Sequence, residues 1–306
     1  MGLRIRTNIS SLNAQRNLEK STKSLQQSMG KLSSGQRINI AADDAAGLAV
    51  SENLRADTRS LTMARRNAND GVSLIQTAEG SLMETSNMLV RLRELAVQAA
   101  SDTIGNNERE FLDKEYLQLK DEIDRIAGST EFNGTRLLVG ERDMPDDMNS
   151  GSSNQFPLEI QVSKDYYADS DGIDKRNPVN IVKIDFGKIN GFTSGDGSLE
   201  LGENEDGTRV HRKEDAQQSI GVIDTAIYKV NEYRAYLGSV QNRLQSTIRN
   251  LAVTNENLTE SMSRVKDTDF AAETAKMTQS NIMQQAGASV LANANVQPQV
   301  ALSLLG

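Results

Sequence analysis

A hydrophobic repeat with a seven-residue period occupies the last third of this 306-residue chain, and it limits the possible folds more than any other feature. Between residues 220 and 265 the apolar positions alternate in steps of three and four, interrupted only by Arg234, Gln241 and Asn255. Such spacing keeps one stripe of a long helix against a partner helix, as in a coiled coil. A single helix cannot bury this stripe by itself, so partner helices must come from the same chain or from other subunits. The expected core includes Ile220, Ile227, Leu237, Leu244, Leu251, Leu258 and Val265.

A second repeat of the same period lies in the first third of the chain. Residues 54–96 place an apolar residue at every seventh position, which at about 1.5 Å per residue makes a helix on the order of 60 Å long. Small residues at companion positions, among them Ala64, Gly71 and Ala78, allow another helix to approach closely. The large residues of this repeat are Leu54, Leu61, Ile75, Leu82 and Leu89.

Two shorter helices are expected beside these long ones. The first carries a Leu every seven residues and ends near Gly35, because Gly readily adopts the backbone conformation that terminates helices. Its repeating residues are Leu18, Leu25 and Leu32. The second covers about 112–126 and follows a turn at 104–107, which suits a helical hairpin.

A last helix is expected near the end of the chain. Asp267-Thr268-Asp269 offers side chains for its N-cap, and the helix runs to about Asn295. From residue 270 to residue 306 the only charges are Glu273 and Lys276, among many Ala, Gln, Asn and Ser residues. We expect this segment to become ordered by packing among copies of itself.

The middle of the chain has a different character. Residues 128–219 hold half of the 22 glycines and three of the four prolines. Apolar residues alternate with polar ones at 158–162 and again at 182–186, which indicates two half-buried strands.

Composition excludes several classes of function. The chain has no Cys and a single His, which leaves no thiolate chemistry and no multi-histidine metal site. No stretch is apolar for long enough to insert in a membrane, and the start lacks the apolar core of a cleavable signal peptide. Residues 1–40 carry a net charge of +6 but no aromatic residue to stack on bases, so nucleic-acid binding is disfavoured.

The residues that could carry chemistry have plainer structural roles. The Asp-rich segment 169–174 lacks the spacing and the terminal Glu of a calcium-binding loop, so turn formation is favoured. Asp43 and Asp44 precede an Ala-rich helix start, where capping and subunit contacts are favoured over acid–base catalysis. His211 has no metal-ligand partner at a useful spacing. The sequence therefore predicts a protein without catalytic residues, cofactor or metal.

Specific sequence blocks at both ends of the chain resemble bacterial flagellin, the subunit of the flagellar filament. The blocks near the start are TNISSLNAQR at 7–16, LSSGQRI at 32–38 and AADDAAGL at 41–48. Those near the end are DTDFAAE at 267–273, QAGASVL at 285–291 and LSLL at 302–305. With RELAVQ at 93–98 and FNG at 132–134, the resemblance covers roughly residues 1–140 and 215–306 in the same order.

The resemblance implies a mainly α fold: a long antiparallel coiled-coil rod formed by the N- and C-terminal halves, with a small central β-hairpin region. Residues 1–40 with 270–306 would form an inner terminal-helix domain. Residues 41–135 with 215–269 would form the helical rod domain. Residues 136–214 would be the β-rich part that completes the rod, leaving little or no separate outer domain. The polymer contacts would lie at Leu18, Leu25, Leu32, Leu291, Leu302, Leu304 and Leu305.

The resemblance also implies partners and a location. The chain would polymerise into an extracellular filament for motility, after export without a cleaved signal peptide. Its other partners would be a flagellar export chaperone, the filament cap and hook-junction proteins. Some flagellins are recognised by Toll-like receptor 5, and the matching positions are Arg91, Leu95 and Glu115. The same surface would serve primarily for axial contact between subunits.

Two alternatives remain open at the level of sequence. A hook–filament junction (hook-associated) protein shares the arrangement of terminal helices, although such proteins match the quoted blocks less well. An enzyme displayed on the filament is the other alternative, because some flagellins carry a metalloprotease in their variable region. The region here is short and contains only His211, without an HExxH motif.

Overall fold

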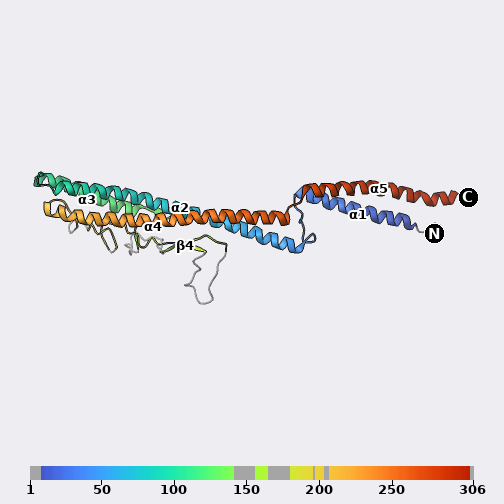
Figure 1. Ribbon diagram of the computed structural model, residues 1–306, viewed down its shortest axis with the longest axis horizontal. Helices are drawn as coiled ribbons and strands as arrows, with labels where there is room; N and C mark the ends of the chain where they lie inside the picture. Colours follow the sequence, from blue (N-terminus) through green and yellow to red (C-terminus); the bar gives the residue numbers. More distant parts are fainter. Residues whose placement is uncertain (1–7, 141–155, 165–179, 196, 203–206, 304–306) are drawn as a thin grey trace, which may run out of the picture. The chain divides into compact units, whose positions relative to one another are not determined.

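The computed structural model describes residues 8–140, 156–164, 180–195, 197–202 and 207–303. The chain divides into two compact units, Met1–Thr58 with Glu256–Gly306 and Arg59–Asn255. We call the first the terminal unit and the second the rod unit. Figure 1 shows the elements: helices α1 (Ile9–Ser34), α2 (Ala45–Ala99), α3 (Asn106–Ser129), α4 (Lys213–Lys266) and α5 (Phe270–Ser303), with short strands between α3 and α4.

The terminal unit is built on an antiparallel pair of helices, α1 and α5. Asn8 begins α1 by accepting a hydrogen bond from the Ser11 N–H at 3.1 Å, and Gly35 ends it in the left-handed conformation at φ 70°. Asp269 caps α5 by accepting from the N–H groups of Ala271 and Ala272, which confirms the predicted N-cap. The last helix extends to Ser303 rather than to about Asn295.

Small and polar residues fill the contact between α1 and α5. Its buried members are Ala14, Ser28, Ser280 and Ala294. The Asn8 side-chain amide donates to the Ala294 carbonyl at 2.8 Å. A Cβ added at Gly287 would lie 3.4 Å from a methyl of Leu18, so the helices pack closely there.

Backbone hydrogen bonds tie the end of α1 to the link between α4 and α5. The Arg37 N–H donates to the Lys266 carbonyl at 2.7 Å, and the Thr268 N–H donates to the Gly35 carbonyl at 3.0 Å. Asp43 accepts from the N–H groups of Asn39 and Ile40, and these bonds lower the pKa of its carboxyl. Asp44 accepts from the Gly47 N–H at the start of α2. Both carboxylates therefore hold a turn and a helix start.

In the rod unit, α2 and α4 run antiparallel and α3 packs beside them, so the coiled-coil fold class predicted from the sequence is confirmed (Figure 1). Contacts along the pair keep a constant register. Gly71 lies beside Leu244, Arg93 pairs with Asp224 at 2.6 Å, and Asp102 pairs with Lys213 at 2.8 Å. In the rod unit the buried positions of α2 step by three and four, with Leu95 as one additional buried residue: Leu61, Ala64, Ala68, Gly71, Ile75, Ala78, Leu82, Thr85, Leu89, Leu92, Ala96 and Ala99.

The buried face of α4 is wider than the predicted stripe. Leu237, Leu244 and Leu251 are buried as part of it. Ile220 and Ile227 are only partly covered, whereas Ser219 and Ala226 beside them are buried. The expected core residues Leu54, Leu258 and Val265 are half-buried and belong to the terminal unit. Because α4 contacts more than one neighbour, its inward face takes an extra column of residues, and small side chains occupy the closest approach.

Two antiparallel hairpins complete the rod unit. β1 (Glu131–Phe132) and β2 (Thr135–Arg136) are joined by Asn133 and Gly134, both at positive φ as a two-residue hairpin turn requires. β3 (Leu158–Gln161) pairs with β4 (Ile181–Ile184), where two strands are expected from the alternating pattern. β3 lies against α2, because a Cβ added at Gly71 would collide with a methyl of Ile160.

Candidate assembly surfaces

The terminal unit exposes large apolar side chains along both of its helices. Ile282 is 60% exposed and Ile9 is 58% exposed. A shallow groove on α5 is lined by several of these side chains together with Ala, Thr and Gln residues. The exposed apolar residues of this unit include Ile9, Leu12, Met29, Phe270, Ile282, Met283, Val290 and Val296. A helix pair with this much uncovered apolar surface is suited to packing against further helices.

The leucines expected to make polymer contacts are placed differently. Leu18, Leu25, Leu32 and Leu291 are half-buried, and Gly287 of α5 lies against Leu18. They therefore contribute to packing within the terminal unit, and other apolar residues, such as Ile9 and Ile282, are more exposed. Leu302 lies within α5, and Leu304 and Leu305 fall outside the described residues.

On the rod unit, Arg91 and Glu115 form an exposed ion pair between α2 and α3. The Arg91 guanidinium donates to the Glu115 carboxylate at 2.8 and 3.0 Å, and to Glu94 at 3.0 Å. The hydrogen bond to Glu115, followed by the one to Glu94, raises the pKa of Arg91. Leu95, expected on the same contact surface, has no exposed area. It packs in the core beneath the pair, where it can support Arg91 and Glu115 but offers no surface of its own.

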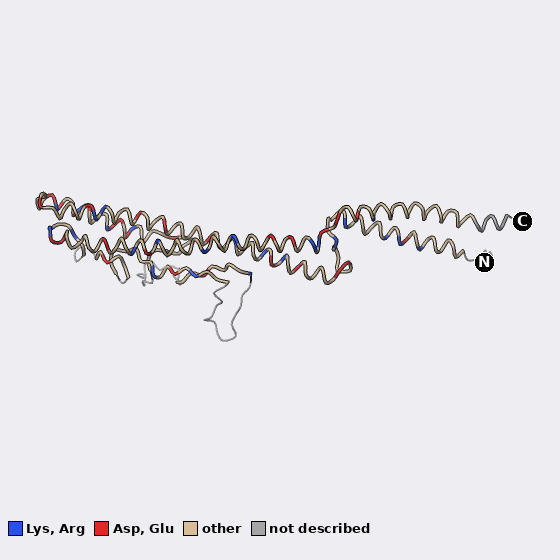
Figure 2. Tube along the Cα trace, in the orientation of Figure 1, with Lys and Arg blue, Asp and Glu red and all other residues tan. Residues whose placement is uncertain are grey.

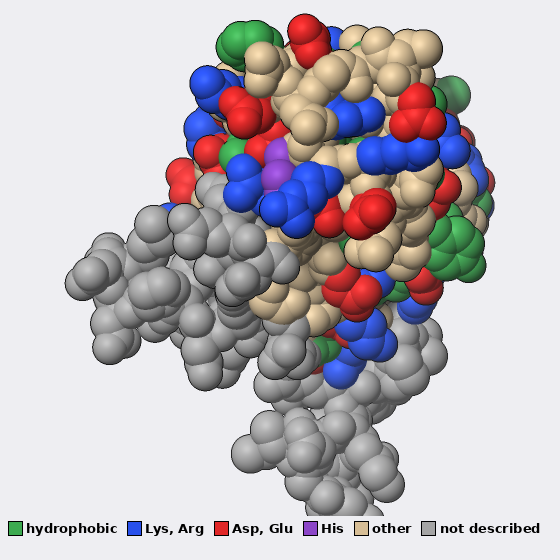
Figure 3. Space-filling model, turned by 90° about the vertical axis from the view of Figure 1, so that its left-hand side faces the viewer, with side chains coloured by type: hydrophobic (Ala, Val, Ile, Leu, Met, Phe, Trp, Pro, Cys, Tyr) green, Lys and Arg blue, Asp and Glu red, His purple; other side chains and the backbone are tan. Residues whose placement is uncertain are grey.

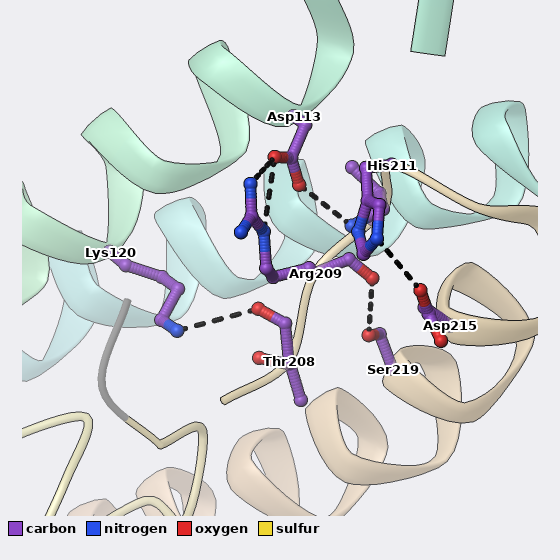
Figure 4. Close-up of polar contacts among 8 residues, drawn as sticks. Asp113, Lys120, Thr208, Arg209, His211, Asp215 and Ser219 are labelled. Carbon is purple, nitrogen blue, oxygen red and sulfur yellow. Dashed lines mark hydrogen bonds and ion pairs between the residues drawn. The ribbon is translucent and has the colours of Figure 1, made fainter. Parts of the chain in front are cut away.

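A buried polar network fastens the segment before α4 to α3 (Figure 4). Asp113 accepts from the Arg209 guanidinium at 2.7 Å and from the Val210 N–H at 2.9 Å. The Tyr116 hydroxyl donates to Thr208 Oγ1 at 2.9 Å. Lys120 Nζ donates to the Leu201 and Thr208 carbonyls at 3.3 and 3.4 Å. Burial lowers the pKa of Lys120 and raises that of Tyr116.

The sequence carried a signal for this network that its apolar pattern did not reveal. Asp113 and Lys120 are seven residues apart; Asp113 lies three residues before Tyr116, and Lys120 lies four after Tyr116 and three before Ile123, so all four share one helix face. Charged residues at such positions point inward with the apolar ones. They are paired because a buried charge without partners is costly.

The end of the rod unit near the start of α4 carries charges of both signs. Figure 3 shows acidic and basic side chains interspersed around the single histidine. His211 lies 3.3 Å from Asp215, one turn along the start of α4. Within the described residues, no cluster of His, Asp or Glu has the arrangement of a metal site. No helix in the same part of the chain is both long and apolar enough to cross a membrane.

Comparison with known proteins identifies the family. The family model of the bacterial flagellin N-terminal helical region matches residues 5–143, and that of the C-terminal helical region matches residues 220–305. The chain belongs to the bacterial flagellin family. A flagellin of Halalkalibacterium halodurans is 40% identical over 98% of this chain and 99% of its own length. That of Bacillus subtilis is 40% identical over 99% of this chain and 100% of its own length.

Two solved structures are similar to parts of this chain. The crystal structure of Bacillus cereus flagellin matches with 32% identity and a TM-score of 0.45, over 61% of this chain and 88% of that one. A structure described as that of a flagellar hook-associated protein from Vibrio parahaemolyticus matches with 13% identity and a TM-score of 0.54. The match covers 74% of this chain and 100% of that one. The second likeness concerns the fold alone, so the hook-associated alternative is not favoured. This flagellin is a structural subunit of the flagellar filament and not an enzyme.

Proposed function

We propose that the terminal unit supplies the principal contacts that hold this flagellin in its filament. The supporting observation is the set of large apolar side chains that α1 and α5 leave exposed, in a helix pair whose buried residues, among those described, are Ala and Ser while its leucines are only half-buried. Polymerisation would cover these side chains with the terminal units of neighbouring copies. Because a heterologous contact of this kind has no closed symmetry, repeating it produces an open helical polymer.

Removal of residues 270–306 tests this proposal. The truncated chain keeps the whole rod unit, so we expect a folded, monomeric protein with a cooperative thermal transition. It should fail to elongate filament seeds at any concentration at which the full chain grows. The measurement is light scattering with electron microscopy, beside circular dichroism for folding. Normal filament growth by the truncated chain would contradict the proposal.

The resemblance supports a set of finer roles around this assembly. The chain would leave the cell without a cleaved signal peptide, and an export chaperone would cover the terminal helices before assembly. The filament cap and the hook-junction proteins would contact the same helices at the two ends of the polymer. Pull-down experiments with each partner test these roles. Each partner should bind the full-length chain but not the truncated chain.

The exposed pair of Arg91 and Glu115 favours a second role as an axial subunit contact, with recognition by Toll-like receptor 5 on the same surface. A receptor reporter assay with monomeric protein tests the receptor role. We expect Arg91→Ala to reduce the signal, whereas Arg125→Ala, which removes a similarly exposed pair on α3, should leave it unchanged. Equal signals from wild type and Arg91→Ala would contradict the assignment.

A further inference from the structure

The rod unit is electrically bipolar along its length. Residues 59–78 and 233–255 contain six arginines and one acidic residue, Asp70. Residues 79–131 and 213–232 contain sixteen acidic and eight basic residues. The antiparallel register of α2 and α4 brings the two basic segments side by side, because Gly71 lies beside Leu244. The same register joins the acidic segments through Arg93 with Asp224. We call these the basic half and the acidic half of the rod unit, and the charges can be followed in Figure 2.

The arginines of the basic half face solvent without carboxylate partners. Arg59, Arg65, Arg66, Arg243 and Arg249 are exposed, and none of their guanidinium groups forms an ion pair or hydrogen bond with another described residue. The acidic half has unpaired carboxylates of its own. Glu84, Glu110 and Glu232 are exposed on three different helices and likewise pair with no described residue. Each half therefore keeps its own sign of charge at the surface.

We propose that the basic half of one rod unit lies against the acidic half of the next copy in the filament. The occupant is a second copy of the chain, because the complementary charge is present on the same unit in the same assembly. If two neighbouring rod units point in the same direction and one is shifted along the rod axis, the basic half of one meets the acidic half of the other. Without a shift, halves of the same charge would lie side by side. The charge pattern thus specifies direction and stagger, which terminal apolar contacts specify weakly. This inference goes beyond the role proposed for the terminal unit.

Three variants of the full chain test the proposal. The first reverses the basic half with Arg65→Glu, Arg66→Glu and Arg249→Glu. The second adds Glu84→Lys, Glu110→Lys and Glu232→Lys, so that both halves are reversed. The third is a control with the same total charge change as the first: Lys114→Glu and Arg125→Glu on the acidic half, and Arg212→Glu directly before its segment 213–232. All nine side chains are exposed or lie at the surface of helices, and circular dichroism melting checks that each variant folds.

The readout is the rate of elongation on fragmented filament seeds. At about 0.01 M salt the first variant should elongate on wild-type seeds at least about tenfold more slowly than wild type, because steering by charge is strongest there. At about 1 M sodium chloride, where the screening length is about 3 Å, the two rates should converge. The control should elongate at the wild-type rate. The doubly reversed variant should elongate on its own seeds, formed at high salt, but poorly on wild-type seeds.

Several outcomes would overturn the proposal. One is a wild-type elongation rate for the first variant at low salt, and another is a slower rate that persists at high salt. The others are an equally slow rate in the control and a failure of the doubly reversed variant to elongate on its own seeds. A failure of the terminal-unit proposal is distinguishable from these. It would appear as growth of the chain truncated at residue 270, and the charge reversals would not change that result.

Discussion

The two units of this flagellin use the same helical element in opposite ways. In the rod unit, large apolar residues such as Leu82 and Ile223 are fully buried by other parts of the same unit. In the terminal unit, residues of the same type on α1 and α5 remain exposed, and the helices meet through buried Ala and Ser residues and half-buried leucines. The rod unit therefore buries an extensive apolar core of its own, although it also exposes residues such as Phe111 and Val253, whereas the terminal unit leaves most of its large apolar residues exposed or half-buried.

This difference separates stability from assembly. A substitution in the rod core acts on the folding of one subunit, because the buried area lies within that subunit. A substitution on the outer face of α5 changes little in the isolated subunit, because the side chain is in water there. In the polymer the same side chain would be covered. Paired substitutions, one in the rod unit and one in the terminal unit, test whether this division holds.

The largest difference is expected between Leu82→Ala and Ile282→Ala. Leu82 is fully buried, so its truncation should reduce the free energy of unfolding of the monomer by about 3 kcal/mol. Ile282 is 60% exposed, so its truncation should leave monomer unfolding within error while raising the concentration needed for filament growth. Urea denaturation and seeded polymerisation measure the two effects. Equal losses of monomer stability would show that the terminal unit is self-sufficient too.

A smaller effect is expected from the buried network that holds the segment before α4. Asp113→Asn removes the charge that pairs with Arg209 and leaves one acceptor for two donors. Because the Arg209 side chain is one-third exposed, we expect a loss of about 2 kcal/mol rather than the full cost of a buried unpaired charge. Glu122→Gln is the matched control, since its pair with Arg125 is solvent-exposed and should contribute little. Similar losses in both variants would mean that burial does not matter here.

The pH dependence of the free energy of unfolding should reveal the lowered pKa of Lys120. Its pKa is lowered in the folded protein, so between that value and the ordinary 10.5 the unfolded chain binds more protons than the folded one. Stability therefore rises with pH in this window for wild type relative to Lys120→Met. Urea denaturation of both proteins at pH 7 and pH 9.5 checks the sign. A constant difference between them would show that Lys120 reaches solvent.

The long helices could be predicted because apolar residues recur in their sequence at a regular spacing. The three-and-four spacing of α2 predicts its buried residues individually, from Leu61 to Leu89. On α4 the same rule predicts Ile220 and Ile227, yet Ser219 and Ala226 are the buried residues. The three-and-four spacing rule describes two helices that meet along a single line of contact. Close packing against additional neighbours favours small side chains, which have no hydrophobic signal in the sequence.

The candidate surfaces were harder to predict because they depend on which side of a helix is left uncovered. Leu95 matches the receptor-contact pattern of the family, but α3 covers it, and only Arg91 and Glu115 reach the surface. Lys120 is charged and was not expected inside, but backbone carbonyls of the segment before α4 supply its partners. Both cases require the position of α3 against its neighbours. Periodicity within one helix does not contain that information.

The smallest effect expected is a gain, and it bears on the comparison between the units. Gly221 in α4 and Gly30 in α1 are both exposed within helices, and a Cβ added at either would meet nothing within 4 Å. Ala at either position should stabilise the monomer by about 0.5 kcal/mol, because Ala loses less backbone entropy than Gly on folding. In the filament the outcomes should diverge. Gly221→Ala should elongate at the wild-type rate, whereas Gly30→Ala places a methyl on the surface that neighbouring terminal units cover and should slow growth. Equal growth rates would mean that the outer face of α1 stays open to solvent in the polymer, and would confine the assembly contacts to α5.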